Sequence, residues 1–80
     1  MKVNVLAFGI VKEIFGNSAI EVDINTTATV EELKIHLEEK YPRLKQLASY
    51  MVAVNNEYAQ QDQLIEIKDE IAIIPPVSGG

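Results

Sequence analysis

A chain of 80 residues forms one domain, and its lack of cysteine excludes disulfides and a cysteine-based zinc site as sources of stability. It carries 12 acidic and 7 basic residues, a net charge of −5, which argues against nucleic-acid binding because that binding needs Lys and Arg to neutralise phosphates. No apolar run approaches the ~20 residues of a membrane span, and strand-like sequence directly follows Met1-Lys2, so we expect a cytoplasmic protein.

The first part of the chain predicts two strands joined by a short helical turn. Residues 2–8 alternate in polarity as a strand does, and Asn4 marks the less buried of the two faces. Residues 10–15 predict the helical turn. Residues 20–24 then alternate strictly between apolar and acidic side chains, which predicts a strand with one buried face.

A helix is predicted from Val30 to about Lys40. Thr29 and Glu32 fit a capping box, in which a hydroxyl and a carboxylate satisfy backbone donors at the helix start. Pro42 ends the helix, because the residue before a proline leaves helical space. The apolar residues fall on one stripe, which we expect to lie across the sheet: Val30, Leu33, Leu37 and Tyr41.

The second half of the chain predicts further short strands. Residues 51–55 read as a strand, 55–57 as a tight turn and 58–59 as a short returning strand. An apolar patch over residues 64–67 is expected in an irregular turn, before a final strand over residues 71–74. Two strands, a helix and later strands that return to the same sheet favour an α+β domain.

The last strand leads into two prolines. Pro75 and Pro76 cannot donate to a sheet ladder, so the strand ends there and the chain leaves stiff and extended. We therefore predict a domain over residues 1–76 and a flexible tail over residues 77–80, whose extended reach is at most ~14 Å.

The tail ends in Gly79-Gly80. Glycines lack a Cβ, so they fit a narrow channel and leave the final carboxylate unhindered. ATP can activate such a carboxylate as an acyl-adenylate, from which a nucleophile displaces AMP. Glycines at a chain end also occur for no chemical reason, so the pair by itself is a weak signal.

Pro75-Pro76-Val77-Ser78-Gly79-Gly80 resembles the carboxyl end of the small subunits of molybdopterin synthase, ubiquitin-like sulfur carriers that end in Pro-Pro-Val-Thr/Ser-Gly-Gly. The resemblance extends over the whole chain, through Val52-Ala53-Val54-Asn55, Asp69-Glu70-Ile71-Ala72 and Gly16 at the end of its Val-Lys-Glu-Ile-Phe-Gly segment. It implies a β-grasp, or ubiquitin-like, roll: one mixed sheet with a helix packed across one face.

The resemblance also implies a function. An adenylating enzyme related to ubiquitin activators would consume ATP to adenylate Gly80, and a sulfur donor protein would convert it to a thiocarboxylate. The tail would enter the large subunit, which supplies the catalytic side chains, in a heterotetramer of two small and two large subunits. Sulfur would pass to the cyclic pyranopterin precursor during molybdenum cofactor biosynthesis.

In this scheme the chain is not an enzyme on its own and binds no cofactor or metal. Gly80 is the chemical group, Gly79 gives clearance, and Pro75-Pro76 set the exit direction. Val77 and Ser78 complete the tail, where the Ser78 hydroxyl can hydrogen-bond in a channel or simply keep the tail solvated.

An apolar surface is expected beside the tail. If the first and last strands are neighbours, Leu6, Phe8, Ala72 and Ile74 share the sheet face opposite the helix. Such patches often mark partner surfaces, and the resemblance implies one that docks on both the adenylating enzyme and the large subunit. We expect Phe8, Tyr58 and Ile74 to contact these partners; the competing interpretation is that loops cover the face.

Other interpretations stay open. The chain could carry sulfur for thiamine or amino-acid biosynthesis, since such carriers also end in Gly-Gly. It could be a ubiquitin-like modifier whose Gly80 is attached to lysines, or a binding domain with an idle tail. His36, the only histidine, lies off the apolar stripe of the helix, so we interpret it as a solvated surface residue and not a catalytic base.

Overall fold

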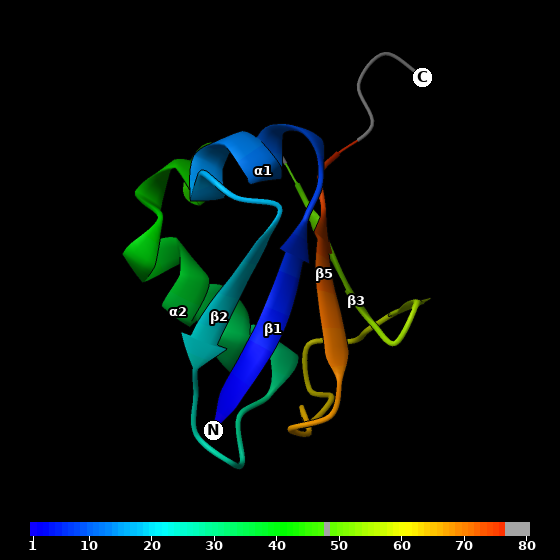
Figure 1. Cartoon of the computed structure of the whole chain (residues 1–80). Helices are drawn as coiled ribbons and strands as arrows, with labels where there is room; N and C mark the ends of the chain where they lie inside the picture. Colours follow the sequence, from blue (N-terminus) through cyan, green and yellow to red (C-terminus); the bar gives the residue numbers. More distant parts are fainter. Residues whose placement is uncertain (48, 77–80) are drawn as a thin grey trace.

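Five strands form one mixed sheet in the computed structural model, which describes residues 1–47 and 49–76 (Figure 1). The order across the sheet is β2-β1-β5-β3-β4, with β1 parallel to β5 and the other neighbours antiparallel. The strands are β1 (Lys2–Ala7), β2 (Ala19–Asp23), β3 (Met51–Val54), β4 (Glu57–Tyr58) and β5 (Glu70–Ile74). This is the β-grasp arrangement, with the first and last strands adjacent as predicted.

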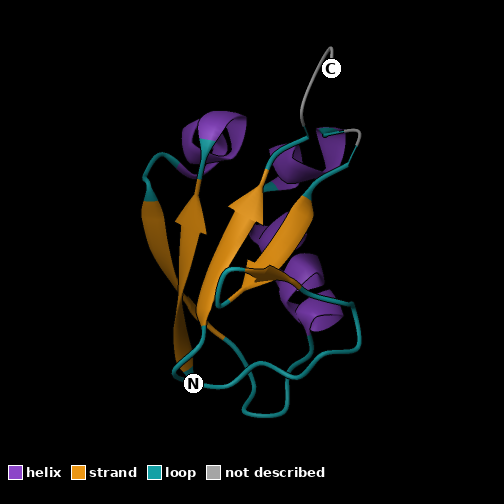
Figure 2. Cartoon of the chain, turned by 90° about the vertical axis from the view of Figure 1, so that its right-hand side faces the viewer, coloured by secondary structure: helices purple, strands orange, loops and turns teal. Residues whose placement is uncertain are grey.

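The helices leave one face of the sheet uncovered. Helix α1 (Gly9–Phe15) follows β1 directly, and helix α2 (Val30–Lys40) packs across one face before the 3₁₀ helix η1 (Pro42–Gln46). Figure 1 shows α2 on one side of the strands, and Figure 2 shows the same arrangement after a quarter turn about the vertical axis. None of the helices in the described part of the chain is long and apolar enough to cross a membrane.

The core lies between the sheet and α2. Alternate residues of each long strand point into it, so Val3 and Val5 of β1 and Ile71 and Ile73 of β5 are almost fully buried. The apolar stripe predicted for α2 packs in the same core, where Val30, Leu33 and Leu37 are buried. Tyr41, the last residue of the stripe, is partly buried. Aliphatic packing therefore accounts for the stability of this domain: the core also includes Val11, Val22, Val30, Leu33, Leu37, Leu44, Val52, Val54 and Ile65.

The capping box at the start of α2 is confirmed. The Glu32 N–H donates to the Thr29 hydroxyl at 3.2 Å, and the Thr29 N–H donates to the Glu32 carboxylate at 3.2 Å. These bonds satisfy backbone donors that have no partner inside the helix. At the other end Pro42 stops α2 as predicted and opens η1, whose Leu44 is buried.

We expect Thr29→Ala to lower the free energy of unfolding by about 1 kcal/mol, because it removes the hydroxyl that caps α2. The measurement is urea denaturation, read as a shift of the midpoint at constant slope. Thr27→Ala changes an exposed threonine two residues earlier and is the matched control. Equal midpoints for the two variants would show that the capping bonds add nothing to stability.

Three local predictions differ from the structure. Phe8 was predicted as the end of the first strand but is the N-cap of α1, because Gly9 turns the chain with φ +54°. Ile20 is only half-buried, and it lies on β2 at the edge of the sheet, which has a neighbouring strand on one side only. Leu64 and Ile67 are exposed, and only Ile65 of the predicted apolar patch enters the core.

The predicted tight turn between β3 and β4 is confirmed. Asn55 and Asn56 adopt φ of +54° and +69°, the left-handed conformation that two-residue hairpins require and asparagine tolerates. The Asn55 amide also donates to Asp69 at 2.9 Å and accepts from the Glu70 N–H at 3.0 Å. Asn55 thus ties this hairpin to the start of β5.

A second polar contact joins α2 to the segment before β3. The Tyr50 hydroxyl donates to the Glu38 carboxylate at 2.5 Å, and the Lys34 ammonium lies 4.9 Å from the centre of the Tyr50 ring. Burial, then the hydrogen bond to Glu38 and the charge of its carboxylate, raise the pKa of the Tyr50 hydroxyl well above its ordinary value. The folded state therefore holds this proton more tightly than the unfolded state.

We expect the free energy of unfolding to decrease less steeply with rising alkaline pH in Tyr50→Phe than in wild type. The stabilisation from the Tyr50 proton is complete below pH ~10, where an unfolded tyrosine titrates, and is lost as pH rises toward the raised pKa of the folded state. Denaturation between neutral pH and pH ~11 should show a shallower decline in the variant than in wild type. Tyr58→Phe changes an exposed tyrosine and should keep the wild-type slope; a wild-type slope in Tyr50→Phe would contradict the assignment.

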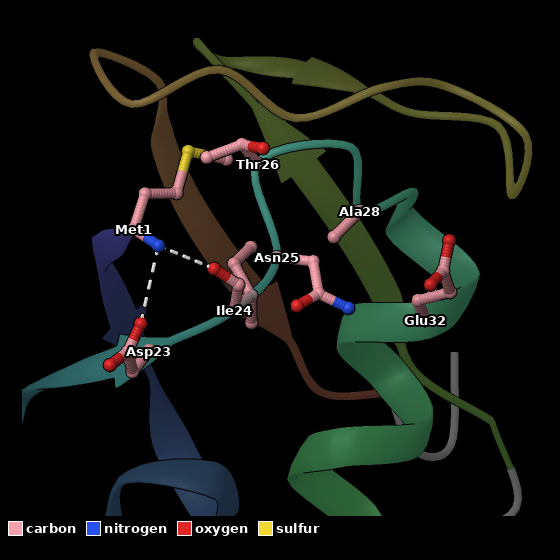
Figure 3. Close-up of a pocket in the computed structure, with 7 residues that line it drawn as sticks. All are labelled: Met1, Asp23, Ile24, Asn25, Thr26, Ala28 and Glu32. Atoms are coloured by element: carbon pink, nitrogen blue, oxygen red, sulfur yellow. Dashed lines mark hydrogen bonds and ion pairs between the residues drawn. The ribbon is translucent and has the colours of Figure 1, made fainter.

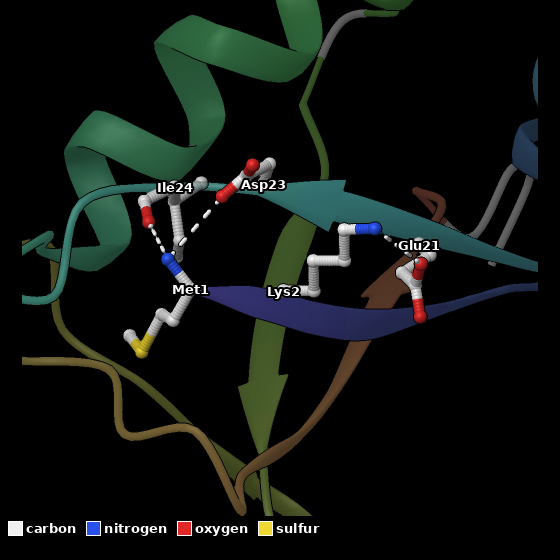
Figure 4. A network of polar contacts seen from close by, with 5 residues as sticks. All are labelled: Met1, Lys2, Glu21, Asp23 and Ile24. Carbon is white, nitrogen blue, oxygen red and sulfur yellow. Dashed lines mark hydrogen bonds and ion pairs between the residues drawn. The ribbon is translucent and has the colours of Figure 1, made fainter.

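Polar contacts also fix the edge formed by β1 and β2 (Figure 4). The Met1 amine donates to the Ile24 carbonyl at 2.5 Å and to the Asp23 carboxylate at 3.2 Å. Lys2 and Glu21 form an exposed ion pair at 3.8 Å. Such exposed pairs contribute little energy, so we assign this network only a small part in the stability of the domain.

Candidate functional site

The uncovered face of the sheet carries a shallow apolar groove. Phe8, Tyr58 and Ile74, the three residues predicted to contact partners, all line it. The exposed fractions are 49% for Phe8 and 69% for Tyr58, large values for aromatic side chains. No loop of the described residues closes over the groove, whose other lining residues are Leu6, Ala53, Asn56, Glu70 and Ala72.

Strand register explains the shape of the groove. Ala72 of β5 lies between Leu6 of β1 and Ala53 of β3, so two alanines stand side by side in the middle of the face. Tyr58 of β4 pairs with Ala53 and lines the groove on the far side of β3 from β5. Small side chains next to larger ones leave a hollow, and its described lining is polar at Asn56, Glu70 and the Tyr58 hydroxyl.

The sequence-based prediction missed part of this groove. Ala53, Asn56 and Glu70 were not among the expected contact residues, although all three line the hollow. The available signal was the Asn55-Asn56 turn, which fixes the pairing of β3 with β4 and so places Ala53 opposite Tyr58. That register could have been derived from the turn, whereas the antiparallel pairing of β3 with β5 could not.

The chain leaves the sheet beside the groove. Strand β5 ends at Ile74, whose side chain lines the groove, and Pro75 and Pro76 follow it half-buried. A Cβ built on Gly9 would lie 3.3 Å from the Pro75 Cγ, so the proline ring lies directly against the turn that starts α1. The predicted tail residues Val77, Ser78, Gly79 and Gly80 lie outside the described residues.

The groove offers contacts but no chemistry of its own. Among the described residues, its lining includes one carboxylate, Glu70, and neither a histidine nor a hydroxyl other than that of Tyr58. His36 is exposed on α2, which packs on the opposite face of the sheet. Within residues 1–47 and 49–76, no three His, Asp or Glu side chains gather in a way that could hold a metal. The described part of the site is therefore suited to binding another protein.

A second, more polar hollow lies near the amino terminus (Figure 3). Its two acidic side chains already have structural roles. Asp23 binds the Met1 amine, and Glu32 forms the capping box of α2. Since both carboxylates are engaged and the hollow is wide open, it contains no acid–base pair for catalysis.

Comparisons with known proteins agree along the whole chain. A family model described as the ThiS family matches residues 5–80. A molybdopterin synthase sulfur carrier subunit from Dictyostelium discoideum is 44% identical over 80 residues, which cover 95% of this chain and 93% of that protein. The match therefore includes both the groove and the residues that follow β5.

Solved structures share the same architecture. SAMP1 from Haloferax volcanii superposes with a TM-score of 0.85 at 27% identity, over the full length of both chains. A chain from the complex of subunits 1 and 2 of the molybdopterin-converting factor of Helicobacter pylori superposes with a TM-score of 0.70, also at 27% identity and over both full lengths. The chain belongs to the ThiS family and is related over its whole length to the molybdopterin synthase sulfur carrier subunits.

Proposed function

We propose that this chain is the sulfur carrier subunit of molybdopterin synthase and that it carries sulfur as a thiocarboxylate on Gly80. The observation that carries the proposal is the 44% identity to a sulfur carrier subunit over 95% of this chain. Two structural features support it. An apolar groove lies on the open sheet face, and the chain exits beside that groove at Pro75.

The chemistry requires an activated carboxylate. A carboxylate oxygen of Gly80 attacks the α-phosphorus of ATP on a partner adenylating enzyme, and pyrophosphate leaves. A sulfide equivalent from a sulfur donor then attacks the acyl carbon, and AMP leaves with the bonding electrons. Because glycine has no side chain, this carbon is unhindered on both steps. This chain itself binds no ATP in the scheme and contributes only the acyl group.

The groove has a separate role, which is docking. The large subunit of the synthase covers Phe8, Tyr58 and Ile74, and burial of these apolar side chains drives association. The residues after Pro76 then extend at most ~14 Å into the active site of the large subunit, which holds the catalytic side chains. Two small and two large subunits form the complex, and sulfur passes to the cyclic pyranopterin precursor.

Reconstitution with defined components tests this proposal. The chain is incubated with ATP, an adenylating enzyme and sulfide, and then with the large subunit and the pyranopterin precursor. We expect dithiolene-containing product in proportion to the thiocarboxylate supplied. Thiocarboxylate that forms but transfers its sulfur only to a thiamine or amino-acid precursor would assign the carrier to another pathway. No thiocarboxylate under these conditions would refute sulfur carriage.

A second candidate is attachment to other proteins. It rests on the likeness to SAMP1, one of the small archaeal modifier proteins, at 27% identity over the full chain. As a modifier, the chain would form an isopeptide bond between the Gly80 carbonyl and a lysine amine. Protein conjugates that are isolated from cells and lost on deletion of Gly80 would support this function; their absence beside abundant thiocarboxylate would support sulfur carriage alone.

A further inference from the structure

We propose that Gly9 is a positioning residue for the carboxyl-terminal tail. Its missing Cβ lets Pro75 lie against the turn between β1 and α1, and this contact sets the direction in which the chain leaves the sheet. The inference rests on the proposed function, because an exit direction matters only if the tail must reach a partner's active site.

The contact at Gly9 would be tight for a side chain. An ideal Cβ would lie 3.3 Å from the Pro75 Cγ, which is closer than ordinary van der Waals contact. Pro75 is half-buried, and because its ring closes onto the backbone it can yield only by a change of ring pucker or a shift of the backbone. A Cβ at position 9 therefore requires Pro75 to give by a few tenths of an ångström, and we infer that this shifts the base of the tail.

Gly16 shows that this crowding is specific to Gly9. Gly9 is the first residue of α1 and Gly16 is its C-cap. Both adopt the left-handed conformation, with φ of +54° at Gly9 and +78° at Gly16. A Cβ on Gly16 would meet nothing within 4 Å. Alanine strains the backbone at either site, but only at Gly9 does it also press on the exit of the chain.

The topology links this contact to the docking groove. Because β1 and β5 are parallel neighbours and Ala7 pairs with Ile73, the end of β1 reaches the end of β5. Phe8 points into the groove, and its carbonyl accepts from the Val11 N–H at 3.0 Å, which holds the turn. One turn thus places both a groove residue, Phe8, and the contact with Pro75, the residue that follows β5.

The experiment compares Gly9→Ala with Gly16→Ala. Each variant is prepared with a thiocarboxylate already on Gly80, so that adenylation plays no part. Single-turnover sulfur transfer in the complex with the large subunit is then measured beside the Kd for that subunit. We expect both variants to bind like wild type but Gly9→Ala to transfer about tenfold more slowly than Gly16→Ala, because small misplacements of reacting groups have large effects on rate.

Two further measurements separate positioning from general damage. A nuclear Overhauser effect between the Gly9 Hα and the Pro75 ring should be present in wild type, and Gly9→Ala/Pro75→Ala should recover much of the lost transfer rate. Equal transfer rates in the two glycine variants, no rescue, or no such Overhauser effect would each overturn the inference while leaving the proposed function intact. Wild-type chain that transfers no sulfur would overturn both.

Discussion

Deletion of Gly80 should abolish sulfur transfer and leave the melting temperature of the domain within about 1 °C of wild type. The core ends at Ile73, and the half-buried Ile74 and Pro75 also precede the deleted residue by several positions. The deletion therefore moves the terminal carboxylate back to Gly79, about 3.5 Å short of its wild-type position, without removing a buried contact of the described residues. Thermal unfolding and the transfer assay, made on the same preparation, measure the two effects.

A matched control adds one glycine after Gly80. This variant keeps an unhindered terminal carboxylate but moves it by one residue, about 3.5 Å. We expect it to unfold like wild type and to transfer sulfur poorly, because a misplaced acyl carbon does not meet the acceptor. A fall of several degrees in melting temperature on deletion of Gly80 would show instead that the end of the chain packs on the domain.

Phe8→Ala should weaken binding to the large subunit at least tenfold, which corresponds to about 1.4 kcal/mol. Phe8 is 49% exposed and lines the groove, so docking would bury an aromatic surface that folding leaves in water. The loss of folding stability should be smaller than that of a fully buried phenylalanine, for which about 3–5 kcal/mol is typical. Calorimetric titration gives the Kd, and urea denaturation gives the stability.

Ile35→Ala is the control for this prediction. Ile35 is 52% exposed, close to the value for Phe8, but it lies on α2 and does not line the groove. Its substitution should leave the Kd unchanged. Equal effects of the two variants on binding would refute the assignment of the groove as the docking surface, and unfolding of the domain by Phe8→Ala would show that Phe8 supports the fold.

Much of the fold could be predicted because local rules act strongly here. Both ends of α2 are fixed locally: side-chain hydrogen bonds of Thr29 and Glu32 cap its start, and the steric effect of Pro42 on the preceding residue ends it. Alternation along residues 2–7 and 70–74 assigns the buried faces of β1 and β5 correctly. The groove residues Phe8 and Ile74 followed from that alternation, once the first and last strands were assumed to be neighbours.

The remaining features depend on tertiary contacts. The half-buried Ile20 lies on a strand at the edge of the sheet, and no local pattern shows which strands are at an edge. Ile65 enters the core while Leu64 and Ile67 stay exposed, because the segment is irregular and has no fixed period. The contact of Gly9 with Pro75 joins residues far apart in the sequence. From the sequence alone, a glycine after a strand predicts only that the strand ends there.

The central claim is that Gly80 carries sulfur, and the intact mass of the chain isolated from its own cells tests it most directly. We predict a species heavier by the replacement of one oxygen with sulfur, and fragmentation should place that change on Gly80. An unmodified mass in cells, together with an unmodified mass after ATP, the adenylating enzyme and sulfide are supplied, would contradict the claim and favour a modifier or a plain binding domain.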